Sequence, residues 1–266
     1  MPDALDVPVA GGLLRVATWP GGGTPVLAIH GITSSSRSWP LLARELDRPV
    51  VAPDLRGRGR SNRLPGPVGL VAHAEDCAAA LRAVTDEPAV VVGHSMGGFV
   101  AQQVAFAAPK RVSRLVLVGT VRKPTNLAGF YELEKAVTSL SDPVPDGFAR
   151  EFQLSTVYTS VGDEFINRAV EESLRLPARV WKELAGGMIA TQAAVSLGRS
   201  GIPTLVVRGE KDAWVTAEET DSLAMMVATK RQKTYANTGH AVHWERPAEF
   251  ASEVVAFRKE TQVAAR

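Results

Sequence analysis

The residues best suited to chemistry are a serine and its neighbours at positions 93–97, which read Gly-His-Ser-Met-Gly. The pattern Gly-x-Ser-x-Gly is typical of a sharp strand-to-helix turn that exposes a serine hydroxyl at the end of the strand. Residues 89–93 are a short apolar run typical of a buried strand, and residues 95–108 have a helical pattern. We therefore expect Ser95 to be a nucleophile. The alternative is a glycine-rich turn in which the serine is incidental.

A serine hydroxyl is a weak nucleophile unless a base takes its proton, and histidine is the usual base. The chain has five histidines. His240 directly follows the last expected strand, where a loop could return it to the strand ends, so we expect it to be the base. His243 is the alternative. His30 ends a different strand, while His73 lies on an expected helix and His94 adjoins the serine, so these two cannot easily approach the hydroxyl.

A carboxylate is needed to orient the imidazole and to stabilise its charged form. Asp212 follows an expected strand at 204–208, so it also lies at a strand end, and we expect it to fill this role. Glu210 and Asp221 are the alternatives nearby. Asp212 could instead be a loop carboxylate that caps the helix expected to begin near Ala217.

These residues depend on a regular alternation of short apolar runs and helical patterns. We expect strands at 13–19, 26–30, 50–54, 89–93, 115–119, 204–208 and 232–235. We expect helices at 39–46, 70–85, 95–108, 217–228 and 247–260. Continuous Val, Leu, Ile and Ala runs are typical of strands that are buried on both faces. The alternation predicts an α/β fold in which helices cover both faces of a mostly parallel sheet.

The alternation stops between residues 121 and 200. This segment shows helical patterns at 126–140 and 163–174 and holds seven of the chain's sixteen aromatic residues. It has no clear buried strand. We therefore expect a helical cap at 121–200, inserted into a single core that is built from residues 1–120 and 201–266.

Composition excludes several classes of protein. The 266 residues carry a formal net charge of +2, which gives little long-range attraction to nucleic acid or to an anionic membrane. The single cysteine, Cys77, excludes an intramolecular disulfide framework and a cysteine-rich zinc site. It falls on the apolar stripe of its helix, so we expect an inert buried thiol. No signal peptide or apolar run of about 20 residues is visible, so we expect a cytoplasmic protein.

One basic cluster could suggest a phosphate site. Arg56, Arg58, Arg60 and Arg63 lie within eight residues of one another, but glycines separate them and no aromatic residues are interleaved. Glycines of this spacing open a turn. We therefore interpret the cluster as a solvated loop.

Taken together, these motifs resemble the α/β-hydrolase superfamily over nearly the whole chain. The chain order serine, acid, histidine is the order found in that superfamily. The chain looks most similar to small bacterial hydrolases with a helical cap, which include carboxylesterases, lactonases, carbon–carbon bond hydrolases and cofactor-free haloperoxidases. The residues that carry the resemblance are His30-Gly31, residues 54–61, residues 93–97, residues 209–212 and Gly239-His240.

The resemblance implies an oxyanion hole made of two backbone N–H groups, those of Ile32 and Met96. It also implies a reaction that needs no metal and no cofactor. Trp214 lies two residues after the candidate acid, and Arg122 lies at the end of an expected strand. We expect both to border the substrate pocket, with a surface location as the alternative for Arg122.

The resulting expectation is a serine hydrolase that cleaves a carboxylic ester or a lactone through an acyl-enzyme intermediate. Its substrate should be a medium-sized, partly apolar small molecule, because pockets under such caps are mostly apolar. Two alternatives remain open from the sequence. One is a carbon–carbon bond hydrolase, and the other is a slow or non-catalytic small-molecule receptor on the same fold.

Overall fold

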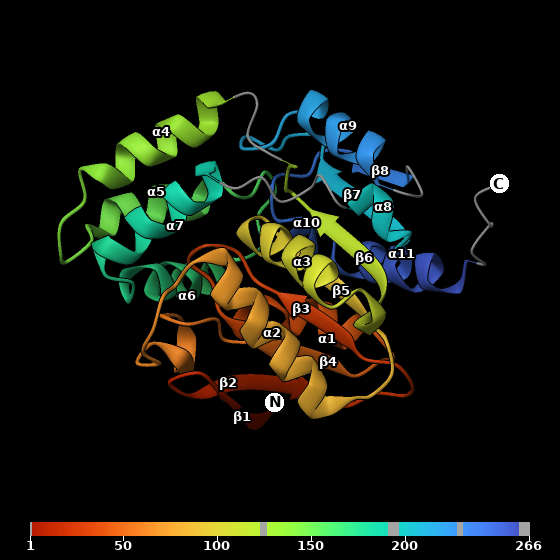
Figure 1. Ribbon diagram of the computed structural model, residues 1–266. Helices are drawn as coiled ribbons and strands as arrows, with labels where there is room; N and C mark the ends of the chain where they lie inside the picture. The colour runs from red at the N-terminus through yellow and green to blue at the C-terminus, as the bar shows by residue number, and fades with distance from the viewer. Residues whose placement is uncertain (1, 123–126, 191–196, 228–230, 261–266) are drawn as a thin grey trace.

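The computed structural model describes residues 2–122, 127–190, 197–227 and 231–260 (Figure 1). In these ranges eight strands form one sheet in the order β1-β2-β4-β3-β5-β6-β7-β8. Strands β3 to β8 run parallel, whereas β2 is antiparallel to both of its neighbours. The strands are β1 (Asp3–Val9), β2 (Gly12–Trp19), β3 (Val26–Ile29), β4 (Val50–Pro53), β5 (Ala89–His94), β6 (Val112–Val118), β7 (Thr204–Gly209) and β8 (Arg231–Tyr235). The predicted α/β fold with a mostly parallel sheet is confirmed.

Helices cover both faces of this sheet, as expected. Those outside the expected cap are α1 (Pro40–Glu45), α2 (Leu70–Val84), α3 (Met96–Ala107), α9 (Ala217–Met226), α10 (Val242–Glu245) and α11 (Pro247–Lys259), with the 3-10 turns η1 (Ser36–Ser38), η2 (Gly59–Ser61) and η3 (Pro109–Arg111). The bounds agree with the expected helices to within a few residues. The expected ends at 126 and 228 lie outside the described residues.

Alternation along the central strands builds the two layers of the core. In β5, Val91 points into the cluster that contains α2 and α3, while Val90 and Val92 point into the cluster that contains α1 and α11. Every residue of β5 is buried. A strand that packs helices on both faces has no polar face, which explains its unbroken apolar run.

Between β6 and β7 the described chain is helical. It contains α4 (Leu127–Thr138), α5 (Asp146–Leu154), α6 (Asp163–Leu174), α7 (Ala178–Ala190) and α8 (Leu197–Ser200). Figure 1 shows α4, α5, α6 and α7 gathered on one side of the sheet. We call these four the cap helices. Trp181 of α7 is fully buried among them, with its ring 5.3 Å from that of Phe148 and 5.1 Å from that of Phe152.

None of the helices in the described ranges is both long enough and apolar enough to cross a lipid bilayer.

The arginine cluster is a correction to the sequence interpretation, because it is not a solvated loop. Arg56 is buried and forms a bidentate ion pair with Asp76 of α2, at 2.6 Å from Nε and 2.8 Å from Nη2. Arg58 is fully buried and its Nη2 donates to His73 Nε2 at 2.8 Å. Arg60 is half-exposed and binds Asp54.

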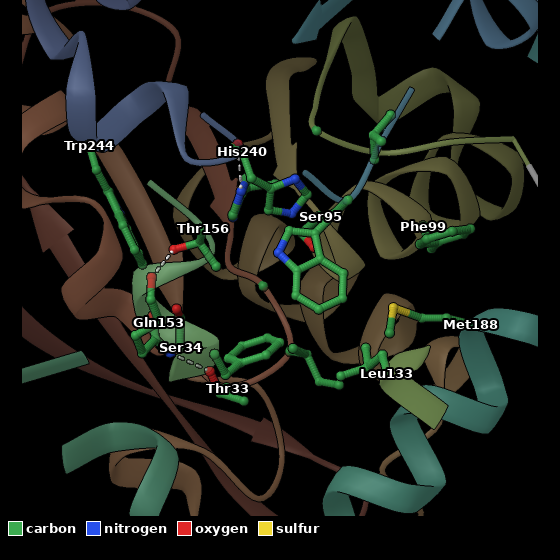
Figure 2. A pocket seen from close by; sticks show the side chains of 17 residues that line it. Thr33, Ser34, Ser95, Phe99, Leu133, Gln153, Thr156, Met188, His240 and Trp244 are labelled. Atoms are coloured by element: carbon green, nitrogen blue, oxygen red, sulfur yellow. Dashed lines mark hydrogen bonds between the residues drawn. The ribbon is translucent and has the colours of Figure 1, made fainter. Parts of the chain in front are cut away.

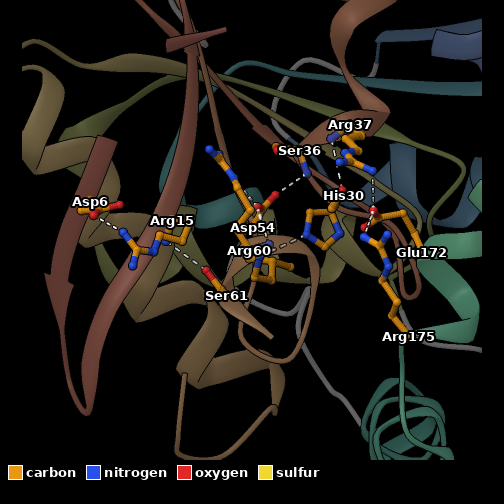
Figure 3. Close-up of polar contacts among 12 residues, drawn as sticks. Asp6, Arg15, His30, Ser36, Arg37, Asp54, Arg60, Ser61, Glu172 and Arg175 are labelled. Atoms are coloured by element: carbon orange, nitrogen blue, oxygen red, sulfur yellow. Dashed lines mark hydrogen bonds and ion pairs between the residues drawn. The ribbon is translucent and has the colours of Figure 1, made fainter. Parts of the chain in front are cut away.

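Asp54 gives this turn its fixed shape. Its Oδ1 accepts the N–H of Ser36 at 2.7 Å, and its Oδ2 accepts the backbone N–H of Arg60 at 2.9 Å (Figure 3). The turn after β4 is therefore tied to the loop after β3. That second loop contains Ile32, so the turn supports the candidate oxyanion hole.

The buried ion pair gives a stability prediction. Changing Arg56→Gln leaves the Asp76 carboxylate buried without its charged partner, and such losses cost roughly 3–5 kcal/mol. Arg63→Gln removes the same charge from an exposed position of the same loop, and should change stability by no more than about 0.5 kcal/mol. Urea unfolding of both variants measures the difference. Equal effects would show that the ion pair contributes nothing specific.

Candidate active site

Ser95 lies on a strained turn between β5 and α3. Its backbone has φ 54° and ψ −121°, a conformation that non-glycine residues rarely adopt. Two glycines make the turn possible. A Cβ atom on Gly93 would lie 2.3 Å from the Gly97 carbonyl oxygen, and a Cβ on Gly97 would lie 2.2 Å from the Ile29 oxygen. The turn holds Ser95 partly exposed between two buried residues.

Asp212 and His240 form the second part of the site. His240 Nδ1 lies 3.0 Å from Asp212 Oδ1 and 2.9 Å from Oδ2. The Asp212 side chain is fully buried and that of His240 is 5% exposed. Because an ionised carboxylate can only accept, Nδ1 of the neutral imidazole carries the proton. Nε2 is then unprotonated and can act as a base.

The loop after β7 fixes the orientation of the acid. Asp212 Oδ1 also accepts the N–H groups of Trp214, at 2.8 Å, and of Val215, at 3.0 Å. The helix that follows does not use Asp212 as its cap, because Thr216 and Glu219 form a reciprocal capping box there. The alternative acids bind other groups: Glu210 accepts the N–H of Asn237 at 3.1 Å, and Asp221 accepts the side-chain amide of Gln232 at 3.1 Å.

His243, the alternative base, is fully buried away from the pocket. Its Nε2 lies 3.1 Å from Ser38 Oγ, and its ring lies 4.5 Å from that of Trp39. Burial, with a smaller contribution from His240, lowers the pKa of His243 to about 3. His94 is also buried, and its Nε2 donates to the His240 carbonyl at 3.2 Å. The neutral His94 ring lies 4.9 Å from the His240 ring, and the neutral His243 ring lies 4.4 Å from that of His94.

His30 supports the loop after β3. Its Nδ1 donates to the Gly31 carbonyl at 2.8 Å, so its Nε2 accepts the N–H of Leu55 at 3.1 Å. Burial, followed by the charge of Arg58, lowers its pKa to about 3. The neutral imidazole thus joins the loops after β3 and β4 and holds the Ile32 backbone at the pocket.

The two residues of the expected oxyanion hole lie beside the serine. Met96 is the first residue of α3 and is fully buried. Ile32 is buried and lines the same pocket as Ser95. The first N–H groups of a helix have no partner within that helix. The Met96 N–H is therefore placed where a developing negative charge could accept from it.

The structure brings Ser95 and His240 to one pocket (Figure 2). The pocket has about 610 Å³ of unfilled space, part of it open to solvent. Its walls are mostly apolar. The apolar side chains are Ile32, Phe99, Leu133, Phe152, Met188, Trp214, Val215 and Trp244.

Of the two expected pocket-border residues, the structure brings only one to the pocket. Trp214 lines it, and its Nε1 donates to Ser155 Oγ at 3.2 Å. Arg122 is half-buried and does not line the pocket in the described part of the chain. The preceding Val121 is fully buried in the core, and its carbonyl accepts the amide of Gln102 at 3.2 Å. The inward packing of Val121 sends the next side chain away.

Several pocket residues were not expected from the sequence, among them Phe99, Val215 and Trp244 of the core. The others named here come from the cap helices or the turn after α5. They are Leu133, Phe152, Gln153, Thr156 and Met188. Phe152 is one of the seven aromatic residues of the segment 121–200. No local motif marks these positions, because the pocket forms only where the cap helices meet the strand ends.

Comparison with known proteins agrees with this geometry. The model of the Alpha/beta hydrolase family matches residues 26–253. The chain belongs to the alpha/beta hydrolase family. The predicted fold class and the resemblance drawn from the sequence are thereby confirmed.

Relatives of this alpha/beta hydrolase cover almost the same length. The lipase LipV of Mycobacterium tuberculosis is 30% identical over 88% of this chain and 93% of its own. A 2-hydroxymuconate semialdehyde hydrolase from a Pseudomonas species is 28% identical over 92% of this chain and 90% of its own. Among solved structures, a thermophilic esterase from Thermogutta terrifontis with malate bound is 25% identical and has a TM-score of 0.82. The match covers 96% of this chain and 97% of the esterase.

The described part of this alpha/beta hydrolase contains no group of three or more His, Cys, Asp or Glu side chains that could hold a metal ion.

Glu245 joins the histidine loop to the cap. Its Oε1 accepts the N–H of Gly239 at 2.7 Å. Its Oε2 accepts the N–H groups of Tyr158, at 3.1 Å, and Thr159, at 2.6 Å, and the Thr159 hydroxyl at 2.7 Å. A further bond runs from the Ala241 N–H to the Thr156 carbonyl at 2.9 Å. The loop that carries the candidate base is therefore fixed from the cap side.

The buried imidazoles predict how stability depends on pH. His30 and His243 have a pKa of about 3 in the folded chain, against about 6.5 when unfolded. The unfolded chain therefore binds more protons between these values, and stability falls as the pH is lowered from 6.5 towards 3. At pH 5 each histidine should remove roughly 2 kcal/mol.

The His243→Gln variant isolates one of these contributions. Urea unfolding at pH 7 and pH 5 should show a pH-dependent loss that is smaller than in the parent protein by roughly 2 kcal/mol. The comparison uses the difference between two pH values, so a general destabilisation by the substitution cancels. Parallel pH dependence in the two proteins would contradict the assignment.

Glu245 gives a separate stability prediction. Glu245→Ala leaves three backbone N–H groups without their acceptor and should cost roughly 2–4 kcal/mol in unfolding free energy. The matched control is Glu249→Ala, which removes a carboxylate of 67% exposure that lies 3.9 Å from Arg246. That change should stay within about 0.5 kcal/mol. Similar losses in both variants would argue against a fixed contact between the cap and the histidine loop.

Proposed function

We propose that this protein is a serine hydrolase that cleaves a carboxylic ester or a lactone through an acyl-enzyme intermediate. The observation that carries the proposal is the contact of His240 Nδ1 with both oxygens of the buried Asp212 carboxylate, beside a serine held on a strained turn in the same pocket. Family membership supports a hydrolase, and the esterase and lipase relatives support the choice of bond.

The mechanism assigns one role to each group. Ser95 Oγ attacks the substrate carbonyl while His240 Nε2 takes the hydroxyl proton. Asp212 holds the imidazole in the tautomer that leaves Nε2 free, and it stabilises the imidazolium that forms. The N–H groups of Ile32 and Met96 bind the oxyanion of the tetrahedral intermediate, where one such donor contributes about 3 kcal/mol.

The intermediate collapses when the alkoxide leaving group receives the proton from His240. Water, deprotonated by His240, then attacks the acyl-enzyme, and Ser95 regains its proton as the acid product leaves. In a lactone the leaving alcohol stays joined to the acyl group, so the product is a single hydroxy acid. The mostly apolar walls favour a partly apolar acyl group.

A carbon–carbon bond hydrolase is the second candidate, because the sequence also resembles such enzymes and a relative of similar length is named a 2-hydroxymuconate semialdehyde hydrolase. The pocket favours the ester or lactone. A substrate that carries a carboxylate needs a cationic partner. Among its described lining residues the pocket has neither lysine nor arginine, and Arg122 does not line it.

The decisive test removes the proposed nucleophile and the proposed base in turn. Ser95→Ala should lower kcat by roughly 10⁶-fold on an activated short ester, since the triad acts as a unit. His240→Gln should cause a comparable loss, while His243→Gln, the matched change three residues away, should retain activity at pH 8, where buried histidines are neutral. Steady-state hydrolysis measures all three. Near-parental turnover in Ser95→Ala would refute the proposal.

Multiple turnover separates the enzyme from a receptor on the same fold. The parent protein should release many equivalents of product per active site, counted with a serine-directed phosphonate. A single equivalent, followed by a stable acyl-protein, would favour the receptor.

A further inference from the structure

Gln153 is a buried polar residue in the wall of an otherwise apolar pocket. It lies in the last turn of α5, and the residue is 1% exposed. Its Nε2 donates to Thr33 Oγ1 at 2.9 Å and to Ser173 Oγ at 2.8 Å. Neither Phe152, which precedes it, nor the other apolar side chains of the pocket can bind its remaining atom, Oε1.

The hydrogen bonds fix which way the amide points. The Ser173 hydroxyl donates its only proton to the Ala169 carbonyl at 3.0 Å, so Ser173 Oγ can only accept from Gln153. The nitrogen must therefore face Ser173. The Thr156 hydroxyl cannot donate to Gln153 Oε1, because it donates its proton to the Gln153 backbone carbonyl at 2.7 Å (Figure 2).

The remaining polar atom of the Gln153 side chain is its amide oxygen, Oε1. Gln153 Oε1 is buried and has no hydrogen-bond partner within the described ranges. A buried acceptor that is unpaired costs free energy, so such atoms in native proteins usually have a function or a bound partner. Here the residue lines the substrate pocket, and it binds Thr33, which directly follows Ile32 of the proposed oxyanion hole.

We propose that Gln153 Oε1 accepts a hydrogen bond from an N–H or O–H group of the substrate, close to the carbonyl that reacts. The natural substrate is then an ester or lactone with an amide N–H or a hydroxyl near the acyl carbon, rather than a plain fatty acyl ester. The inference rests on the proposed function for the reacting bond. It adds the chemical group that selects the substrate.

Matched ester pairs test this directly. The first pair is the ethyl ester of N-butanoylglycine and its N-methyl analogue, and the second is ethyl 2-hydroxyhexanoate and ethyl 2-methoxyhexanoate. The parent protein should prefer the donor-bearing member of at least one pair by about tenfold to 100-fold in kcat/KM. The pair that shows the preference identifies the donor as N–H or O–H.

Substitutions then assign the preference to Gln153. Gln153→Met keeps the length of the side chain and removes both the amide oxygen and the amide nitrogen. In this variant the ratio of the two kcat/KM values within the pair should fall to near one. The loss should come mainly from the donor-bearing ester. Gln103→Met, the matched control, makes the same change at a half-buried position of α3 that does not line the pocket, so it should retain the ratio.

Two results would overturn the inference. If Gln153→Met lowers both esters of each pair by the same factor, the residue only supports the loop that contains Ile32. If the parent protein shows no preference in either pair, a water molecule satisfies Oε1 and the substrate does not.

Binding separates this inference from the proposed function. Titration calorimetry with the Ser95→Ala variant compares the same esters without hydrolysis. Tighter binding of the donor-bearing ester that is lost in the Ser95→Ala, Gln153→Met double variant supports the role of Gln153, even if the parent protein hydrolyses no ester. Rapid ester hydrolysis by the parent, with equal binding within both pairs, supports the function and refutes the inference.

Discussion

The strained turn at Ser95 is the constraint on which the rest of the site depends. A non-glycine residue at φ 54° costs about 1–3 kcal/mol and persists only where its surroundings fix it. Here β5 is buried between two parallel strands, and α3 packs so closely on the end of β3 that only glycine fits at Gly97. The packing that sets the turn also brings the Ile32 loop beside the serine. The same close packing therefore stabilises the core and positions the proposed nucleophile.

The histidine side chains that surround this turn are neutral. His30, His94 and His243 are buried, and burial lowers the pKa of each. A positive charge on any of them would oppose formation of the His240 imidazolium. The Asp212 carboxylate, which accepts two backbone N–H groups as well as His240 Nδ1–H, remains positioned to stabilise that cation. Burial thus keeps positive charge off the three histidines that surround the site.

Features that a local pattern of residues determines could be predicted from the sequence. Buried parallel strands appear as apolar runs, and the ends of two of them, β5 and β7, lie next to Ser95 and Asp212. His240 follows β8, which is mostly exposed and polar. Prediction failed where a contact joins distant segments. Arg56 looked solvated because its partner Asp76 lies twenty positions away on another element. Strand β1 was missed because it is an edge strand with an alternating, partly exposed pattern that contains Pro8. Helices α5 and α7 were missed in the cap, and with them part of the pocket wall.

The contacts of the cap show why its sequence cannot vary freely, although the substrate pocket lies partly within it. The turn after α5 supplies Thr156 to the pocket and accepts the N–H of Ala241. Glu245 links Thr159 to Gly239 on the other side of His240. Substrate choice can therefore change through side chains on the pocket face of α4, α5 and α7. Any change that moves residues 156–159 also moves the proposed base, so the cap acts as a structural part of the catalytic site and not as a separable lid.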